Sequence, residues 1–403
     1  MSELLAAKYG LPSEVLFCSR CVMSNQRPSS SVEFKHTKTH RHSVLRFDEA
    51  RVCDACRVAE RKQQIDWKER ERELVDLLAQ YRRHDGGYDI LVPGSGGKDS
   101  IYASHVLKYR YGMHPLTVTW APHLYTEVGW KNFENWLHMG GFDNYLFTPN
   151  GRVHRKLTKL AFENLLHPFQ PFILGQKNFP PRVAAAQGIK LVMYGESEAE
   201  YGNPKAEVST AQRDLSYFAS HKNALQELFL SGVPVAELEK YDISLAELQP
   251  YFPADREVLQ RANIDVRYLG YYLKWVPQEC YYYSVEHVGF QASSERTPGT
   301  YSKYNSIDDK IDDFHYYTTF IKFGIGRATY DAAQEIRNGH ISREEGVALV
   351  RRFDGEFPER YFKDFLDYIG ISRERFFELI DQFRSPHLWE KRQEGWHLRH
   401  QVA

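Results

Sequence analysis

The sequence predicts an α/β protein built on a doubly wound parallel sheet, preceded by a cysteine-rich block and followed by a mainly helical region. Three observations support this prediction. Short apolar segments typical of strands alternate with segments of helical periodicity through the middle of the chain, which indicates parallel βαβ units. Two CxxC pairs precede these units. A glycine-rich loop follows the first predicted strand.

Residues 1–56 are the predicted zinc-binding block. Its cysteines make two CxxC pairs: Cys18 with Cys21, and Cys53 with Cys56. Each pair can present two thiolates to one ion, and four thiolates complete the tetrahedral shell of a structural zinc site. Four thiolates also bind an iron–sulfur cluster, and one pair can act as a redox dithiol, so these alternatives stay open. Three histidines between the pairs are expected in exposed loops: His36, His40 and His42.

A linker helix over residues 57–84 and an α/β domain over 85–299 come next. The linker is highly charged, and its apolar residues recur at helical spacing over 57–83. In the α/β domain, strands are expected at 88–92, 115–120, 145–147, 189–194 and 266–275. Helices are expected at 98–111, 130–138 and 153–166, and a helical insertion over about 205–262.

Residues 300–403 are predicted to be mainly helical and to complete the active site. The segments ATYDAAQEIRNGHISREEGVALVRRF and FELIDQF carry helical periodicity. Gly339 and Gly346 are expected to break it.

Composition limits the classes of function. Lys and Arg number 52 against 53 Asp and Glu, a formal net charge of −1, whereas a protein that grips nucleic acid usually has a basic excess. No apolar run reaches the roughly 18 residues that a membrane span needs. The first residues, MSELLAAKYGLPSEV, lack the layout of a secretory signal, so a cytoplasmic location is expected.

The glycine-rich loop is the strongest functional signal. It reads Ser95-Gly96-Gly97-Lys98-Asp99-Ser100, directly after a predicted strand and at the start of a predicted helix. Adjacent glycines let backbone N–H groups approach a phosphate, and the helix dipole favours the anion. Lys98 and the hydroxyls of Ser95 and Ser100 add donors, and Asp99 is expected to bind magnesium next to the phosphates. The alternative is an ordinary glycine turn, and the spacing excludes a Walker loop.

Other candidates lie further along the chain. Trp120 ends the second predicted strand and either contacts adenine or belongs to the core. Glu196 opens the acidic loop 195–203 after the fourth strand, where strand ends line a ligand crevice. Three cations near glycines and aromatic residues are candidates for phosphate or carboxylate contacts: Lys303, Lys322 and Arg327. Cys280 is expected to be a small buried residue.

The string SGGKDS resembles the PP-loop of the ATP pyrophosphatase superfamily, whose loop holds the pyrophosphate that leaves ATP. Nearly the whole chain resembles the N-acetyl sugar amidotransferases of the WbpG/PseA type. The resemblance rests on the cysteine pairs, the loop, YLGYYLKW and above all YNSIDDKIDDFHYYTTFIKFGIGRATYDAAQEIRNG. The sequence departs from the family at Ala50-Arg51, where a glycine is expected, and Gly94 before the loop is unusual.

The resemblance implies an enzyme that converts the N-acetyl group of a bacterial surface sugar, expected to be nucleotide-linked, into an acetamidino group. ATP, Mg²⁺ and Zn²⁺ are the implied cofactors. Residues 95–100 would hold pyrophosphate and magnesium, with Lys98, Asp99 and Lys322 as the catalytic set, and Lys322 and Arg327 would stabilise phosphate charge. Ammonia would come from a separate glutaminase by way of a barrel subunit, the two resembling the histidine-biosynthesis pair. The implied pathways are lipopolysaccharide O-antigen synthesis and pseudaminic acid modification.

Two other functions remain open. Enzymes with a PP-loop that thiolate tRNA also carry CxxC pairs, although the neutral charge of this chain disfavours a nucleic-acid substrate. A non-catalytic subunit that scaffolds a glutaminase complex is the third reading, and the intact Lys98-Asp99-Ser100 argues against it.

Overall fold

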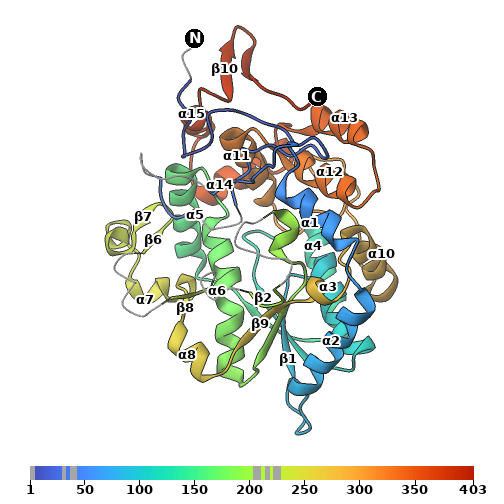
Figure 1. The fold of residues 1–403 in the computed structure, drawn as a ribbon. Coiled ribbons are helices and arrows are strands. Elements are labelled where there is room, and N and C mark those ends of the chain that lie inside the picture. The colour runs from blue at the N-terminus through green and yellow to red at the C-terminus, as the bar shows by residue number, and fades with distance from the viewer. Residues whose placement is uncertain (1–4, 30–32, 37–42, 203–209, 214–217, 221–227) are drawn as a thin grey trace.

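The computed structural model describes residues 5–29, 33–36, 43–202, 210–213, 218–220 and 228–403 (Figure 1). Within this part of the chain one sheet has five strands: β1 (Ile90–Pro93), β2 (Pro115–Trp120), β3 (Asp143–Phe147), β4 (Leu191–Tyr194) and β9 (Asp265–Tyr268). The order is β3-β2-β1-β4-β9, and all neighbours are parallel. The chain winds outward from β1 to β3 and then returns to β4, so the topological switch lies between β1 and β4. Ligands of such sheets bind outside the strand ends at this switch.

Helices cover both faces of the sheet because alternate strand residues point to opposite sides. Ile90 and Val92 of β1 pack under α2 (Trp67–Tyr81), α3 (Lys98–His105) and α10 (Pro277–Val288). Leu91 points to the other face and packs with α6 (Gln170–Gln187) and α8 (Arg256–Arg261). Helix α4 (Glu127–His138) joins the α3 side through Phe133. The predicted doubly wound sheet is confirmed.

Several element boundaries differ from the predictions. The single helix expected over 57–83 is two helices, α1 (Asp54–Lys62) and α2, because Asp66 caps the second by accepting from the Lys68 N–H at 3.0 Å. A π-helical turn, Val106–Arg110, continues α3. The last strand was predicted to extend to residue 275 but ends at Tyr268, because α9 (Leu269–Tyr272) begins at the next residue. Helix α6 was not predicted, because its Pro180-Pro181 pair argues against a helix interior.

The insertion over 205–262 is less helical than expected. Its described residues contain short strands: β5 (Ala219–Ser220), β6 (Phe229–Leu230), β7 (Val233–Pro234) and β8 (Ala254–Asp255). Two 3₁₀ turns, Val235–Tyr241 and Gln249–Tyr251, join them, along with the short helices α7 (Leu245–Leu248) and α8. Residues 205–209, 214–217 and 221–227 of the predicted insertion lie outside the described residues.

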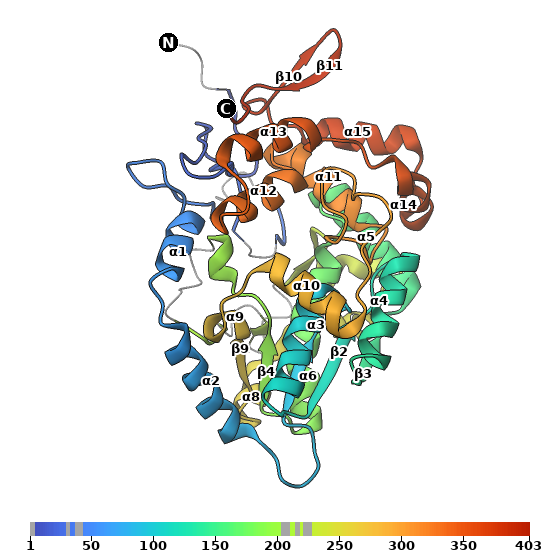
Figure 2. The same cartoon turned by 90° about the vertical axis from the view of Figure 1, so that its right-hand side faces the viewer.

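The C-terminal region is helical, as predicted. It contains α11 (Asp312–Phe323), α12 (Arg327–Arg337), α13 (Arg343–Phe353), α14 (Phe362–Ile369) and α15 (Arg373–Phe383), with a 3₁₀ turn at Glu359–Tyr361. A hairpin of β10 (Trp389–Arg392) and β11 (Gly395–Leu398) follows and projects from the body of the molecule (Figures 1 and 2). Gly339 separates α12 from α13, but Gly346 lies inside α13, where a Cβ would come 2.5 Å from Ile336. Among the described helices, none has the length and apolarity of a membrane span.

A second hydrophobic core joins the two ends of the chain. The buried cysteines and Val22 of the N-terminal block pack in one cluster with α11, α12, α14, α15 and α5 (Gly151–Leu165). In both views these segments form a layer over the carboxyl edge of the sheet (Figures 1 and 2). The first and last predicted regions therefore close together over the switch point.

Candidate active site

The glycine-rich loop forms a phosphate-sized cradle at the end of β1. Gly97 is the N-cap of α3, and no side chain caps this helix. Gly96 has φ +83°, and a Cβ there would come 2.7 Å from the Phe133 Cα, so only glycine fits. A Cβ on Gly94 would come 2.2 Å from the Ser100 Cβ, which explains the glycine that precedes the loop. Ser100 Oγ donates to the Gly97 carbonyl at 2.9 Å. The loop residues line a cavity of about 210 Å³.

Lys98 and Asp99 meet at the mouth of this cradle. Lys98 Nζ lies 2.7 Å from Asp99 Oδ2. Burial disfavours the charged ammonium, but the Asp99 carboxylate outweighs that effect and keeps the pKa of Lys98 above its usual value. The second oxygen, Asp99 Oδ1, is buried and makes no hydrogen bond. An unsatisfied carboxylate oxygen beside a phosphate cradle fits a Mg²⁺ ligand.

Two further carboxylates face the cradle, Asp308 and Asp312. Burial raises the pKa of Asp308, and a hydrogen bond from Ser95 opposes that shift. Burial also raises the pKa of Asp312 to about 7, although the Arg327 charge lowers it. Neither carboxylate was predicted as a site residue, but both lie in the string YNSIDDKIDD, whose acidic pairs were the available signal.

The segment that carries Asp308 is held in place by its neighbour Asp309. Asp309 Oδ2 accepts from the backbone N–H of His123 and lies 2.7 Å from His123 Nδ1. Its Oδ1 accepts from the backbone N–H groups of Leu124 and Ile311. Asp309 is buried, so these contacts fix residues 308–311 against the end of β2.

A cavity of about 260 Å³ lies beside the cradle, over the ends of β2 and β4. Trp120 lines it and is also packed in the core against Phe147 and Phe179, so the core interpretation of Trp120 is confirmed and its contact with adenine stays a prediction. Glu196 lines the same cavity and accepts from the Tyr201 hydroxyl. Burial and the Asp99 charge raise the pKa of Glu196 to about 7. The acidic loop faces the glycine-rich loop, as expected, because Glu196 and Ser95 line the same cavity. Asn203, at the end of the acidic loop, lies outside the described residues.

A third cavity, of about 510 Å³, opens between the sheet and the layer above it. Glu196 and the 3₁₀ turn Glu198–Tyr201 form one side, and α11, α12 and the N-terminal block form the other. Lys98, Asp99 and Arg327 line both this cavity and the cradle, so the two spaces meet at those residues. Arg327 Nε lies 3.1 Å from Asp331 Oδ1.

The N-terminal block contributes Arg27 to this cavity, a residue that the sequence did not single out. Its side chain is 5% exposed, and its guanidinium donates to the Tyr201 carbonyl and lies 5.4 Å from the Tyr330 ring centroid. Arg27 Nε is buried without a hydrogen-bond partner. Isolated in sequence, Arg27 gives no motif, and only the shared core brings it to the site.

The other two predicted cations have different surroundings. Lys322 lines the large cavity and is 1% exposed, but its Nζ lies 2.5 Å from Glu33 Oε2 and donates to the Leu165 carbonyl at 2.7 Å. The contact with Glu33 fastens α11 to the N-terminal block, and the contact with Leu165 fastens it to α5. Lys303 is exposed and donates to the Ser294 carbonyl at 2.8 Å, outside the described cavities. The structure therefore does not bring Lys303 into the site.

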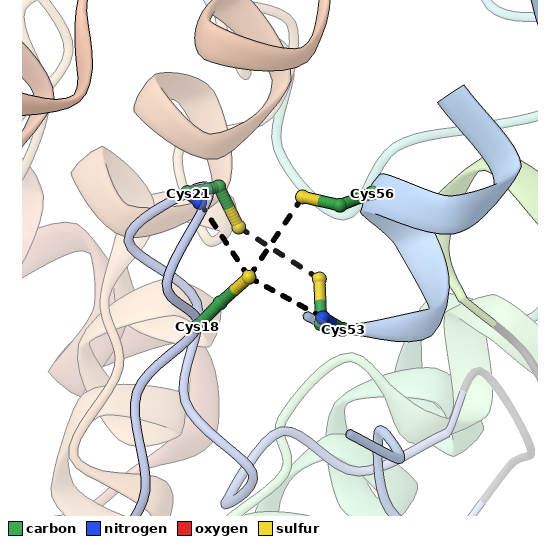
Figure 3. Close-up of side chains that lie close together, drawn as sticks. All are labelled: Cys18, Cys21, Cys53 and Cys56. Carbon is green, nitrogen blue, oxygen red and sulfur yellow. Dashed lines mark hydrogen bonds between the residues drawn. The ribbon is translucent and has the colours of Figure 1, made fainter. Parts of the chain in front are cut away.

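The four N-terminal cysteines form one cluster (Figure 3). Their sulfurs face one another within 4.8 Å, with Cys18 Sγ 3.9 Å from Cys56 Sγ and Cys21 Sγ 3.8 Å from Cys53 Sγ. Zinc–sulfur bonds of about 2.3 Å in a tetrahedron put sulfurs close to this separation. All four cysteines are buried, and backbone N–H groups of Arg20 and Cys53 point at Cys18 Sγ. The group fits a single tetrahedral metal ion.

Nearby residues account for the geometry of this cluster. Arg51, where the family resemblance led us to expect glycine, adopts φ +58°, the left-handed conformation that glycine favours. The half-buried Arg337 lies close enough for the thiolates of Cys21 and Cys56 to raise its pKa, against the effect of burial. His36 packs against Tyr9 and Glu33 rather than standing exposed, and His40 and His42 lie outside the described residues. Cys280 is buried, as predicted.

Comparisons with known proteins add a family for the C-terminal region. Residues 298–402 match the model of the LPS biosynthesis protein WbpG-like family, C-terminal domain. The resemblance is confirmed for this segment, which carries Asp308, Asp312 and Arg327. No curated protein matches the chain.

Similar solved structures include three enzymes. An NH3-dependent NAD synthetase from Campylobacter jejuni is 11% identical (TM-score 0.26) over 32% of this chain and 56% of its own. An NMN synthetase from Francisella tularensis is 14% identical (TM-score 0.26) over 62% and 93%. The tRNA thiolase NcsA from Methanococcus maripaludis is 12% identical (TM-score 0.29) over 77% and 87%. The chain thus spans little more than half of the first enzyme.

Proposed function

We propose that the chain is an ATP-dependent amidotransferase that converts an N-acetyl group of a bacterial surface sugar into an acetamidino group. One observation carries the proposal. The phosphate cradle of the SGGKDS loop opens directly into a much larger cavity, and the shared wall includes a residue of the WbpG-like segment, Arg327. A nucleotide and a sugar-sized acceptor can therefore meet at one point.

The reaction divides between the cavities. The acetamido oxygen attacks the α-phosphorus of ATP, the bond to the β-phosphate breaks, and pyrophosphate leaves into the cradle. Ammonia then forms a bond to the imidate carbon and loses a proton, and the carbon–oxygen bond breaks to release AMP with the former amide oxygen. Glu196 lines both neighbouring cavities and is placed to accept that proton.

The chain's own groups hold and polarise the nucleotide. The uncapped N–H groups of α3 and Lys98 bind the leaving pyrophosphate. Asp99, Asp308 and Asp312 would hold Mg²⁺, which when bound neutralises charge on the phosphates. Arg27 and Arg327 bind anionic groups on the acceptor side. The cysteine cluster would hold Zn²⁺ with four protein ligands, so that its role is to fold the N-terminal block.

The wider assignments follow the family resemblance. The acceptor would be a nucleotide-linked N-acetylated sugar of lipopolysaccharide O-antigen or pseudaminic acid synthesis. Ammonia would come from a glutaminase through a barrel subunit, and the reaction would take place in the cytoplasm. The balanced charge of −1 agrees with a small-molecule acceptor rather than a nucleic acid.

The test uses purified chain with ATP, Mg²⁺ and a high ammonium concentration, which makes a glutaminase unnecessary. A panel of N-acetylated nucleotide sugars is offered, with the acetyl oxygen replaced by its heavy isotope. The proposal expects an amidine product, pyrophosphate, and AMP that carries the label. AMP formation that requires tRNA and a sulfur donor would contradict the sugar substrate and indicate a tRNA-thiolating enzyme. Binding of a glutaminase without any ATP cleavage would contradict a catalytic role and indicate a scaffold subunit.

A further inference from the structure

A separate small cavity of about 110 Å³ lies beside the cysteine cluster. It is bounded by α1, by the start of α10 and by the carboxyl end of α12, three segments that gather on one side of the molecule (Figure 2). Gln334 of α12 lines both this space and the 510 Å³ cavity. Glu200 lines the small cavity, while Glu198 and Tyr201 of the same 3₁₀ turn line the large one. One turn and one side chain thus separate the two spaces.

The lining of this cavity suits a small uncharged molecule. A volume of about 110 Å³ holds a few water-sized molecules and excludes a sugar or a nucleotide. Ala59 and Val276 supply small apolar walls. Lys274, Arg337 and His340 also line it, and Arg337 Nη1 is buried without a hydrogen-bond partner. Lys62 Nζ is held 2.8 Å from Glu200 Oε2. The other charged groups of the lining are Lys274 and Arg337 against the single carboxylate of Glu279, which leaves an excess of positive charge.

This charge pattern discriminates between the two forms of ammonia. Ammonium carries a positive charge, so the Arg337 guanidinium and the Lys274 ammonium repel it. Uncharged ammonia meets no such repulsion and can accept a hydrogen bond from the unsatisfied Arg337 Nη1. Ammonia is also the only form with the lone pair that the amidine-forming step needs.

We propose that ammonia enters the active site through this small cavity, past Gln334, and not through the mouth that admits the acceptor. The inference rests on the proposed function, because it names the route of that reaction's nucleophile. With the acceptor and ATP bound, the large cavity is filled from its own mouth. A second entrance then lets ammonia reach the imidate carbon while the acceptor and ATP occupy the larger cavity.

A plug placed after folding tests the route. Ala59→Cys introduces a thiol on the cavity wall, and the native cysteines are all buried, so benzyl methanethiosulfonate modifies the new thiol. Glu60→Cys, exposed on the same helix and outside the cavity lining, is the matched control. Labelled Ala59→Cys should lose about tenfold or more in kcat/KM for ammonia, with unchanged KM for acceptor and ATP. A reductant that removes the label should restore the rate.

Acceptor-dependent pyrophosphate–ATP exchange, measured without ammonia, separates the two proposals. If exchange persists and labelled Ala59→Cys still uses ammonia as well as labelled Glu60→Cys does, the route is wrong and the proposed function stands. If no acceptor supports exchange in the unmodified chain, the proposed function fails, and the route fails with it. Ala59→Trp, which fills the wall without a reagent, should reproduce the loss in ammonia use.

Discussion

Asp99 is one of the residues at which the cradle and the 510 Å³ cavity meet, and one of its carboxylate oxygens is buried with no hydrogen-bond partner. We predict that Asp99→Asn lowers acceptor-dependent AMP formation by about 10²–10³-fold, the typical loss when one group is removed from a preorganised charge-stabilising site. The melting temperature should change little, because the Asn amide oxygen can still accept from Lys98 Nζ and the substitution removes one of several carboxylates crowded around the cradle. Thermal melts and AMP release check both parts. Asp76→Asn, exposed on α2, is the control and should change neither.

Glu196 supplies a prediction about pH. Burial, together with the Asp99 charge, raises the pKa of the Glu196 carboxyl to about 7 from its ordinary value of 4.5. The folded chain therefore binds more protons at this site than the unfolded chain between those values, and wild-type stability falls as the pH rises through that window. Glu196→Gln removes the titration, so the variant should match wild type near pH 5 and exceed it by about 1–3 kcal/mol at pH 8. Denaturant unfolding without ATP or Mg²⁺ measures this difference, and parallel pH profiles would contradict it.

At the residue scale, the sequence revealed the parts of the site that are contiguous in the chain. Residues 95–100 could be identified as a phosphate-binding loop from sequence alone, because the predicted strand, the loop and the predicted helix are adjacent in the chain. Lys303 was chosen for its charge in a polar segment, yet the neighbouring Asp308 faces the cradle, since the Asp309 contacts decide which side chains turn inward. Arg27 could not be found from sequence, because tertiary packing alone brings it to the cavity.

The segment 308–311 is the element that joins the WbpG-like region to the sheet. Asp309→Ala would leave the backbone N–H groups of His123, Leu124 and Ile311 without their buried acceptor. We predict a loss of about 3–5 kcal/mol in unfolding free energy, typical of breaking a buried charged contact. AMP formation should fall as well, because Asp308 is no longer held against the cradle. Asp309→Asn keeps one acceptor oxygen and should cost less. Equal stability of wild type and the alanine variant would contradict this role.

The type of an element was predictable where a single sequence signal, such as a buried apolar segment, determined it. Continuous apolar segments located the parallel strands β1, β2 and β4, because both faces of the sheet are buried there. The prediction failed for α6, because the helix contains Pro180 and Pro181 in its interior, where both are buried. It also failed at the α1–α2 break, where one Asp66 cap outweighs continuous charge patterning.

In the part of the chain that the structure describes, the hydrophobic clusters fall into two groups, and we expect the two groups to depend differently on bound metal. One lies on the sheet faces and is built from residues of the α/β domain. The other joins the cysteine block to the C-terminal helices, so the block is not an independent appendage. Because the two end regions of the chain share a core, Arg27 of the N-terminal block and Arg327 of α12 line the same 510 Å³ cavity.

This arrangement predicts that metal loss affects one core more than the other. Binding free energy at a four-thiolate site contributes directly to folding, on the order of 10 kcal/mol for zinc. Cys53→Ser, or a strong chelator, should therefore lower the melting temperature of the shared core, while the melting temperature of the sheet core should stay unchanged. Hydrogen exchange should show lost protection in α11, α12 and the N-terminal block, with β1, β2 and β4 still protected. Metal analysis should find one zinc per chain in the wild type, and visible absorption with bound iron would identify a cluster instead. Protection lost equally in β1 and α12 would mean that the two cores unfold as one cooperative unit.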